Sequence, residues 1–89
     1  MIVFDNIKRT DASFMKNSES EFEFYNRSSK PEVESVRRLI EEFISHYPEK
    51  EVIELVHRLR STDNANFRSA VFELFLHEAL LRQGYTLSI

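Results

Sequence analysis

The fold is decided by residues 67–83, which read FRSAVFELFLHEALLRQ. Apolar side chains occupy nearly the whole helical wheel of this stretch, so it predicts one long helix that needs neighbours on most of its sides. The preceding residues 61–66, STDNAN, are rich in side chains that cap helix N-termini, and this loop marks where the helix begins. Residues 67–83 are therefore expected to form the central helix of the molecule.

Two polar residues, Glu73 and His77, stand one turn apart on this helix with apolar neighbours. A carboxylate in such surroundings is costly unless it is paired, hydrogen-bonded, protonated or bound to a cation. Glu73 is therefore the candidate catalytic acid, and its i, i+4 spacing from His77 can chelate a metal ion. The alternative is a structural salt bridge, for which Arg27, Arg37 and Arg68 are the candidate partners.

Gly84 closes the helix, and the residues after it, YTLSI at 85–89, alternate apolar and polar side chains as a β-strand does. A single strand cannot satisfy its own backbone N–H and C=O groups. We therefore expect the chain to be the front part of a longer protein. The alternative is that residues 87–89 pair with residues 2–4, in the same chain or in a second copy.

Residues 31–60 predict two helices joined by a very short link. Pro31 suits a first helical position, and from there to about His46 the apolar side chains fall within one arc of the helix surface. Because Pro48 disfavours helical geometry at the residue before it, the first helix should end near His46, and the second should run to about Arg60. The short link predicts that the two helices pack antiparallel.

Residues 1–30 are polar and interrupted, and we expect an arm that lies on a domain formed by residues 31–89. Within the arm, Ser18-Glu19-Ser20-Glu21 fits a capping box that would start a short helix with Phe22 and Tyr25 on one side. An extended segment is the other interpretation. The predicted fold is thus mainly α, with an N-terminal arm, an antiparallel helical pair, a long third helix and a short C-terminal strand.

The composition limits the function classes. A length of 89 residues suffices for one small domain, and the absence of Cys removes disulfides and thiolate metal sites. A single Gly argues against a P-loop, a dinucleotide-binding loop or an EF-hand. No apolar run is long enough for a membrane helix and no signal peptide is present, so we expect a cytoplasmic protein without a membrane partner. The formal net charge of −3 argues against a broad nucleic-acid-binding surface.

Residues 72–77, FELFLH, followed by residues 80–85, LLRQGY, and the opening of a strand, resemble the entry to a PD-(D/E)xK nuclease-like domain. In that fold, a first helix bearing an acidic residue leads through a Gly turn into a mixed sheet. Three further segments resemble the N-terminal helical region of uncharacterised bacterial proteins of this type: residues 20–22, 26–28 and 67–73.

The resemblance implies that Glu73 corresponds to the acidic residue of the family's first helix. It also implies that the sequence stops before the Pro-Asp pair and the (Asp/Glu)-x-Lys triplet. In the family these residues hold a divalent metal and activate water for phosphodiester cleavage.

Three functions follow from these observations. The first is a non-catalytic N-terminal helical segment of a larger nuclease-like protein, whose divalent metal and nucleic acid would be bound only by the full-length protein. The second is a small helical interaction module that forms a homodimer through the third helix or the terminal strand. The third is a small metal-dependent enzyme that uses Glu73 and His77. No cofactor is expected in this chain alone for the first function.

Overall fold

The computed structural model describes residues 2–84, which form four α-helices. The helices are α1 (Glu21–Arg27), α2 (Pro31–Ser45), α3 (Glu49–Leu59) and α4 (Asn64–Arg82). Within the described residues the only β-type pairing is one isolated bridge between Asp11 and Ser28. The mainly α prediction is confirmed, while the strand expected at 85–89 lies outside the described residues.

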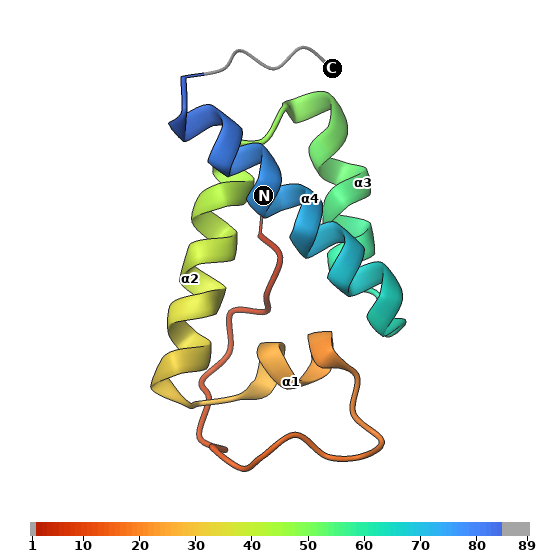
Figure 1. Cartoon of the computed structure of the whole chain (residues 1–89). Coiled ribbons are helices and arrows are strands. Elements are labelled where there is room, and N and C mark those ends of the chain that lie inside the picture. Colours follow the sequence, from red (N-terminus) through yellow and green to blue (C-terminus); the bar gives the residue numbers. More distant parts are fainter. Residues whose placement is uncertain (1, 85–89) are drawn as a thin grey trace.

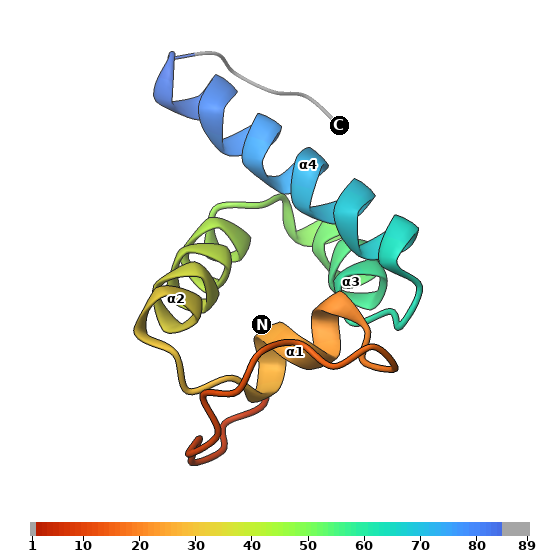
Figure 2. The same ribbon diagram turned by 60° about the horizontal axis from the view of Figure 1, so that its bottom comes forward.

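The helices surround a short N-terminal segment. α2 and α3 run in opposite directions, and α4 contacts α1, α2 and α3 (Figure 1). The antiparallel orientation of the helical pair is therefore confirmed. However, α2 and α3 make few contacts with each other, because the N-terminal segment lies between them (Figure 2). The prediction that the short link brings α2 and α3 into direct contact is therefore wrong.

Val3 and Phe4 are the residues that separate the two helices, and both are buried. The backbone N–H of Val3 donates to the Glu41 carboxylate of α2 at 2.8 Å. Its carbonyl accepts from the Arg60 guanidinium just after α3 at 2.5 Å. The strand pairing expected for residues 2–4 would have its partner outside the described residues, and in this structure side chains satisfy the backbone of Val3 instead.

Local signals explain where α1 begins. The Oγ of Ser20 accepts from the Glu23 N–H at 3.1 Å, and the Glu23 carboxylate accepts from the Ser20 N–H at 2.9 Å. This reciprocal capping box confirms the short helix in the arm and excludes the extended alternative. The predicted cap was two residues too early, because the box starts at Ser20 and not at Ser18.

Prolines and caps set the other helix ends. Pro31 occupies the first turn of α2, which ends at Ser45 with His46 as its C-cap, as predicted. Pro48 is the N-cap of α3. α4 begins at Asn64 rather than at Phe67, because Asp63 accepts a hydrogen bond from the Ala65 N–H at 2.9 Å and so starts the helix earlier.

The core collects side chains from every helix and from the N-terminal segment. Leu55, Leu59 and Leu74 are fully buried at its centre. The remaining buried apolar members of the core are Val3, Phe4, Phe22, Ile40, Phe43, Ile44, Val52, Val56, Phe67 and Ala70.

Within residues 2–84, no helix combines the length and apolarity needed to cross a membrane.

Candidate functional site

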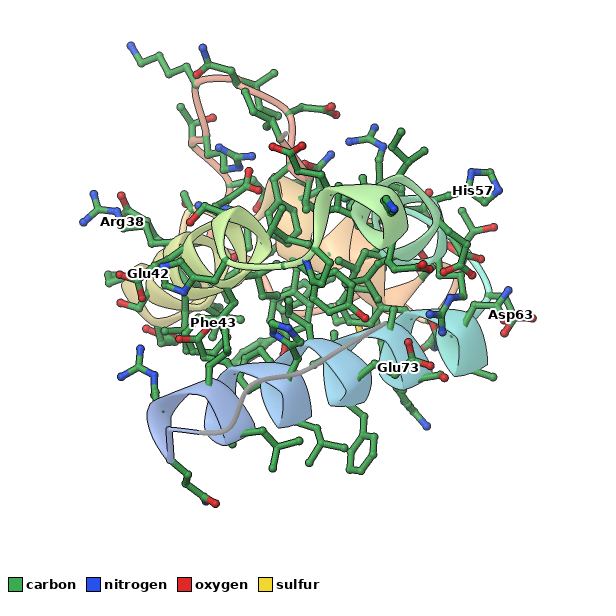
Figure 3. The ribbon with its side chains drawn as sticks, turned by 90° about the horizontal axis from the view of Figure 1, so that it is seen from above. Arg38, Glu42, Phe43, His57, Asp63 and Glu73 are labelled. Atoms are coloured by element: carbon green, nitrogen blue, oxygen red, sulfur yellow. The ribbon has the colours of Figure 1, made fainter. Side chains whose placement is uncertain are left out.

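Glu73 is a surface residue in an ion pair. Its carboxylate accepts from the Arg58 guanidinium of α3, with Nη1 to Oε1 at 3.1 Å, and its side chain is 45% exposed. Figure 3 shows Glu73 on the side of α4 that faces α3. The hydrogen bonds from Arg58 hold the pKa of Glu73 below its usual value, although partial burial opposes this shift.

The partner of Glu73 differs from those the sequence suggested. Arg58 also pairs with Glu54, so it joins two acids at the surface between α3 and α4. The suggested partners have other roles, because Arg27 pairs with Glu19 and Arg68 pairs with Glu21. Glu73 therefore forms a salt bridge, as the alternative interpretation predicted, but with a different arginine. An exposed pair of this type stabilises a fold by at most about 1 kcal/mol.

His77 lies on the buried side of α4. It is 7% exposed, and its ring packs on that of Tyr47 with the centroids 4.7 Å apart. Its Nδ1 bonds to no protein atom among the described residues. Residues 2–84 contain no cluster of three or more His, Asp or Glu side chains that could hold a metal ion. A metal site formed by the two residues Glu73 and His77 stays a prediction.

Glu78 is the acid that α4 does bury. It is 4% exposed, and its carboxylate contacts His46 Nδ1 at 2.9 Å and Arg82 Nε at 3.1 Å. Burial would raise the pKa of Glu78, but the hydrogen bonds from His46 and Arg82 outweigh it and leave the pKa lowered. This network ties the C-terminal end of α2 to α4.

The side of α4 that faces away from the other helices is apolar. Phe72 is 67% exposed and Leu76, one turn later, is 48% exposed. We call these two residues the α4 ridge. Beside it lies an open groove of about 440 Å³ between α1 and α4, with Glu21 and Arg68 at its edge. Its apolar lining consists of Tyr25, Phe67, Val71, Phe72 and Phe75.

Comparisons with family models, curated proteins and solved structures find no match for this chain. The functional argument therefore rests on the residues themselves. Sequence reasoning identified α4 as apolar on nearly every side, which is the signal that leads to the α4 ridge. It did not identify Glu78 as the buried acid, because the helical wheel alone does not show which face the other elements cover.

Proposed function

We propose that this chain is a helical interaction module that forms a homodimer through the α4 ridge and the groove beside it. The observation that carries the proposal is the exposure of Phe72, whose ring is 67% exposed on the longest helix. Contiguous apolar surface of this kind tends to associate, because association removes it from water.

A second copy is the partner that fits best. The ridge and the groove lie on the same helix, so two copies related by a twofold axis each offer a ridge to the other's groove. In such a pair, the α4 ridge of each copy would pack against the partner's groove, whose apolar lining includes Tyr25, Val71 and Phe75. The surface would then be self-complementary. The two charged residues of the groove lining, Glu21 and Arg68, form an ion pair with each other, so their charges are already paired.

Sedimentation or light scattering over a range of concentrations tests this proposal. We expect a monomer–dimer equilibrium that Phe72→Glu weakens by about thirtyfold or more, since loss of a central aromatic anchor costs about 2 kcal/mol. Ile53→Glu is the matched control, because Ile53 on α3 is 66% exposed and lies outside the ridge. A monomer at every concentration, or equal weakening by both substitutions, would contradict the proposal.

The nuclease-like protein is the second candidate, and the same ridge favours it. In the family that residues 72–85 resemble, the first helix is followed by a sheet, and a sheet packed on α4 would cover Phe72 and Leu76. The chain would then be the non-catalytic helical front of that protein, and the divalent metal would bind elsewhere. Reading the native gene beyond codon 89 tests this. A Pro-Asp pair followed by (Asp/Glu)-x-Lys supports it, and an immediate stop codon contradicts it.

A further inference from the structure

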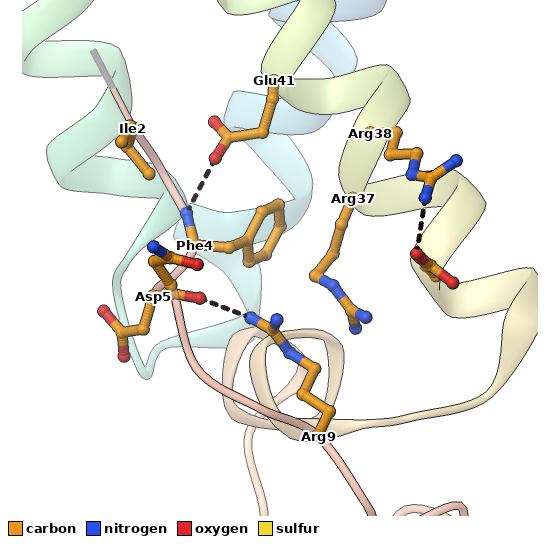
Figure 4. A pocket seen from close by; sticks show the side chains of 9 residues that line it. Ile2, Phe4, Asp5, Arg9, Arg37, Arg38 and Glu41 are labelled. Atoms are coloured by element: carbon orange, nitrogen blue, oxygen red, sulfur yellow. Dashed lines mark hydrogen bonds and ion pairs between the residues drawn. The ribbon is translucent and has the colours of Figure 1, made fainter.

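A cavity that is open to solvent lies where the N-terminal segment crosses α2. It measures about 440 Å³, and its lining includes Phe4 from the N-terminal segment and Arg37 from α2 (Figure 4). A smaller adjoining cavity measures about 200 Å³. Arg9, Glu34 and Arg37 line both of them, so these three residues stand where the two cavities meet.

Arg9 and Arg37 differ from every other arginine of the chain. Among the described residues, neither has a carboxylate within salt-bridge distance, and yet Arg37 is only 8% exposed. A buried guanidinium that forms no salt bridge is unusual, because transfer of a charge from water is costly. The arginines that do pair with a carboxylate are Arg27, Arg38, Arg58, Arg60, Arg68 and Arg82.

Both guanidinium groups bind backbone carbonyls at the end of α1, and Nη1 and Nη2 of Arg9 also donate to the carbonyls of Ile7 at 3.3 Å and Asp5 at 2.7 Å. Nη1 of Arg37 donates to the carbonyls of Tyr25 at 2.8 Å and Ser28 at 2.7 Å. Nε of Arg9 donates to the carbonyl of Asn26 at 2.5 Å. Carbonyls satisfy donors but carry no full charge, so both positive charges remain. Nε and Nη2 of Arg37 donate to no protein atom among the described residues, which leaves these donors free for a ligand.

Three carboxylates also line the cavity, those of Asp5, Glu34 and Glu41, and each of them is already bound to a neighbouring group. Glu41 accepts from the N–H groups of Val3 and Phe4. Glu34 pairs at 2.8 Å with Arg38, which also lines the larger cavity. Burial lowers the pKa of Arg37 and the neighbouring positive charge of Arg9 lowers it further, although the negative charge of Glu34 opposes both effects. An anion between the two guanidinium groups would relieve this repulsion.

We propose that this cavity binds a phosphate group, of the class carried by phosphate monoesters, between Arg9 and Arg37. Two guanidinium charges match a phosphate monoester, whose charge near pH 7 is about −1.5 to −2, better than they match a carboxylate. The planar fork of Arg37 presents its free Nε and Nη2 donors to two phosphate oxygens.

Titration of the intact protein with inorganic phosphate tests the proposal. The Nε–H resonances of Arg9 and Arg37 in a nitrogen-15 NMR spectrum should shift and saturate with phosphate, and should shift far less with acetate. Sodium chloride at matched ionic strength controls for screening. If the shifts in chloride equal those in phosphate, the site does not exist. If acetate binds as tightly as phosphate, the assignment to a dianion is wrong.

Substitution of Arg9, the less buried of the two arginines, locates the site. Arg9→Gln should weaken phosphate binding by about tenfold or more, because it removes one charge-assisted contact. Arg68→Gln makes the same change of charge on α4, away from the cavity, and should leave the affinity unchanged. Helical circular dichroism verifies that each variant folds. The wild-type titration decides the question even if Arg9→Gln unfolds, and equal affinity in a folded Arg9→Gln would overturn the proposal.

Discussion

Single side chains join the helices of this protein at polar contacts that are buried to very different degrees. Glu73 and Glu78 stand five positions apart on α4. Glu73 pairs with Arg58 of α3, and Glu78 contacts His46 and pairs with Arg82 one turn later. Only Glu78 is buried, so only there does loss of the partner leave a charge without water. We therefore expect Glu78 to matter to stability and Glu73 to matter little.

The lowered pKa of Glu78 predicts how stability depends on pH. Because the folded-state pKa lies below the ordinary value of 4.5, this carboxylate stabilises the fold fully above pH 4.5. The contribution is lost as the pH falls below that value and through the folded-state pKa. Wild type should therefore exceed Glu78→Gln in free energy of unfolding at pH 7, and the difference should shrink towards pH 3.

Urea denaturation at a series of pH values measures this difference. Glu42→Gln is the matched control, because Glu42 lies 3.8 Å from the same Arg82 but its side chain is 56% exposed. That variant should follow wild type closely at every pH. A difference between wild type and Glu78→Gln that stays constant from pH 7 to pH 3 would contradict the assigned titration.

At the scale of elements, short sequence signals determine where each helix begins. α1 has only seven residues, too few to be stable in water alone, so its cap and its packing must hold it together. The Ser20 and Glu23 capping box satisfies two backbone N–H groups at this N-terminus. The buried Phe22 anchors the helix by stacking on Phe4, with ring centroids 5.7 Å apart.

The cap of α1 is testable by substitution. Ser20→Ala should lower the free energy of unfolding by about 1 kcal/mol, because the Glu23 N–H loses its acceptor. Ser18→Ala is the matched control, since Ser18 is exposed and precedes the capping box. The midpoints of urea denaturation compare the two variants. If Ser18→Ala destabilises the protein as much as Ser20→Ala, the cap is not the one the structure shows.

At the scale of the whole molecule, the N-terminal segment completes the core. Phe4 is 4% exposed, whereas Ile2, two residues earlier, is 68% exposed. Substitutions of these two residues therefore distinguish the effect of burial from the effect of lying near the N-terminus. Residues 3–4 fill the space between α2 and α3, so the first part of the predicted arm is a structural component of the helical core.

Phe4→Ala should lower the free energy of unfolding by about 3–5 kcal/mol, because it removes a buried ring and leaves a cavity. Ile2→Ala should change it by less than about 0.5 kcal/mol, as for most exposed positions. Small domains have total stabilities of about 5–15 kcal/mol, so Phe4→Ala is expected to leave the protein close to unfolding. Equally small effects of both substitutions, measured by thermal or urea denaturation, would show that the segment is dispensable.

The sequence by itself determined that this protein is mainly helical and where its helices lie. Pro31 and Pro48 placed the boundaries of α2 and α3, because prolines act on the backbone within one or two residues. The short helix α1 was one of two interpretations of its segment, and the cap assigned to it was misplaced by two positions. These signals are local, so they can be read without knowing the neighbours of a helix.

Only the tertiary structure decided which face of each element is buried. Glu73 pairs with Arg58 because α3 and α4 lie against each other, and Glu78 is buried because the end of α2 reaches it. Val3 enters the core through contacts with residues far along the chain, Glu41 and Arg60. Burial depends on which elements arrive from elsewhere, and a helix that is apolar on nearly every side, as α4 is, leaves that choice open.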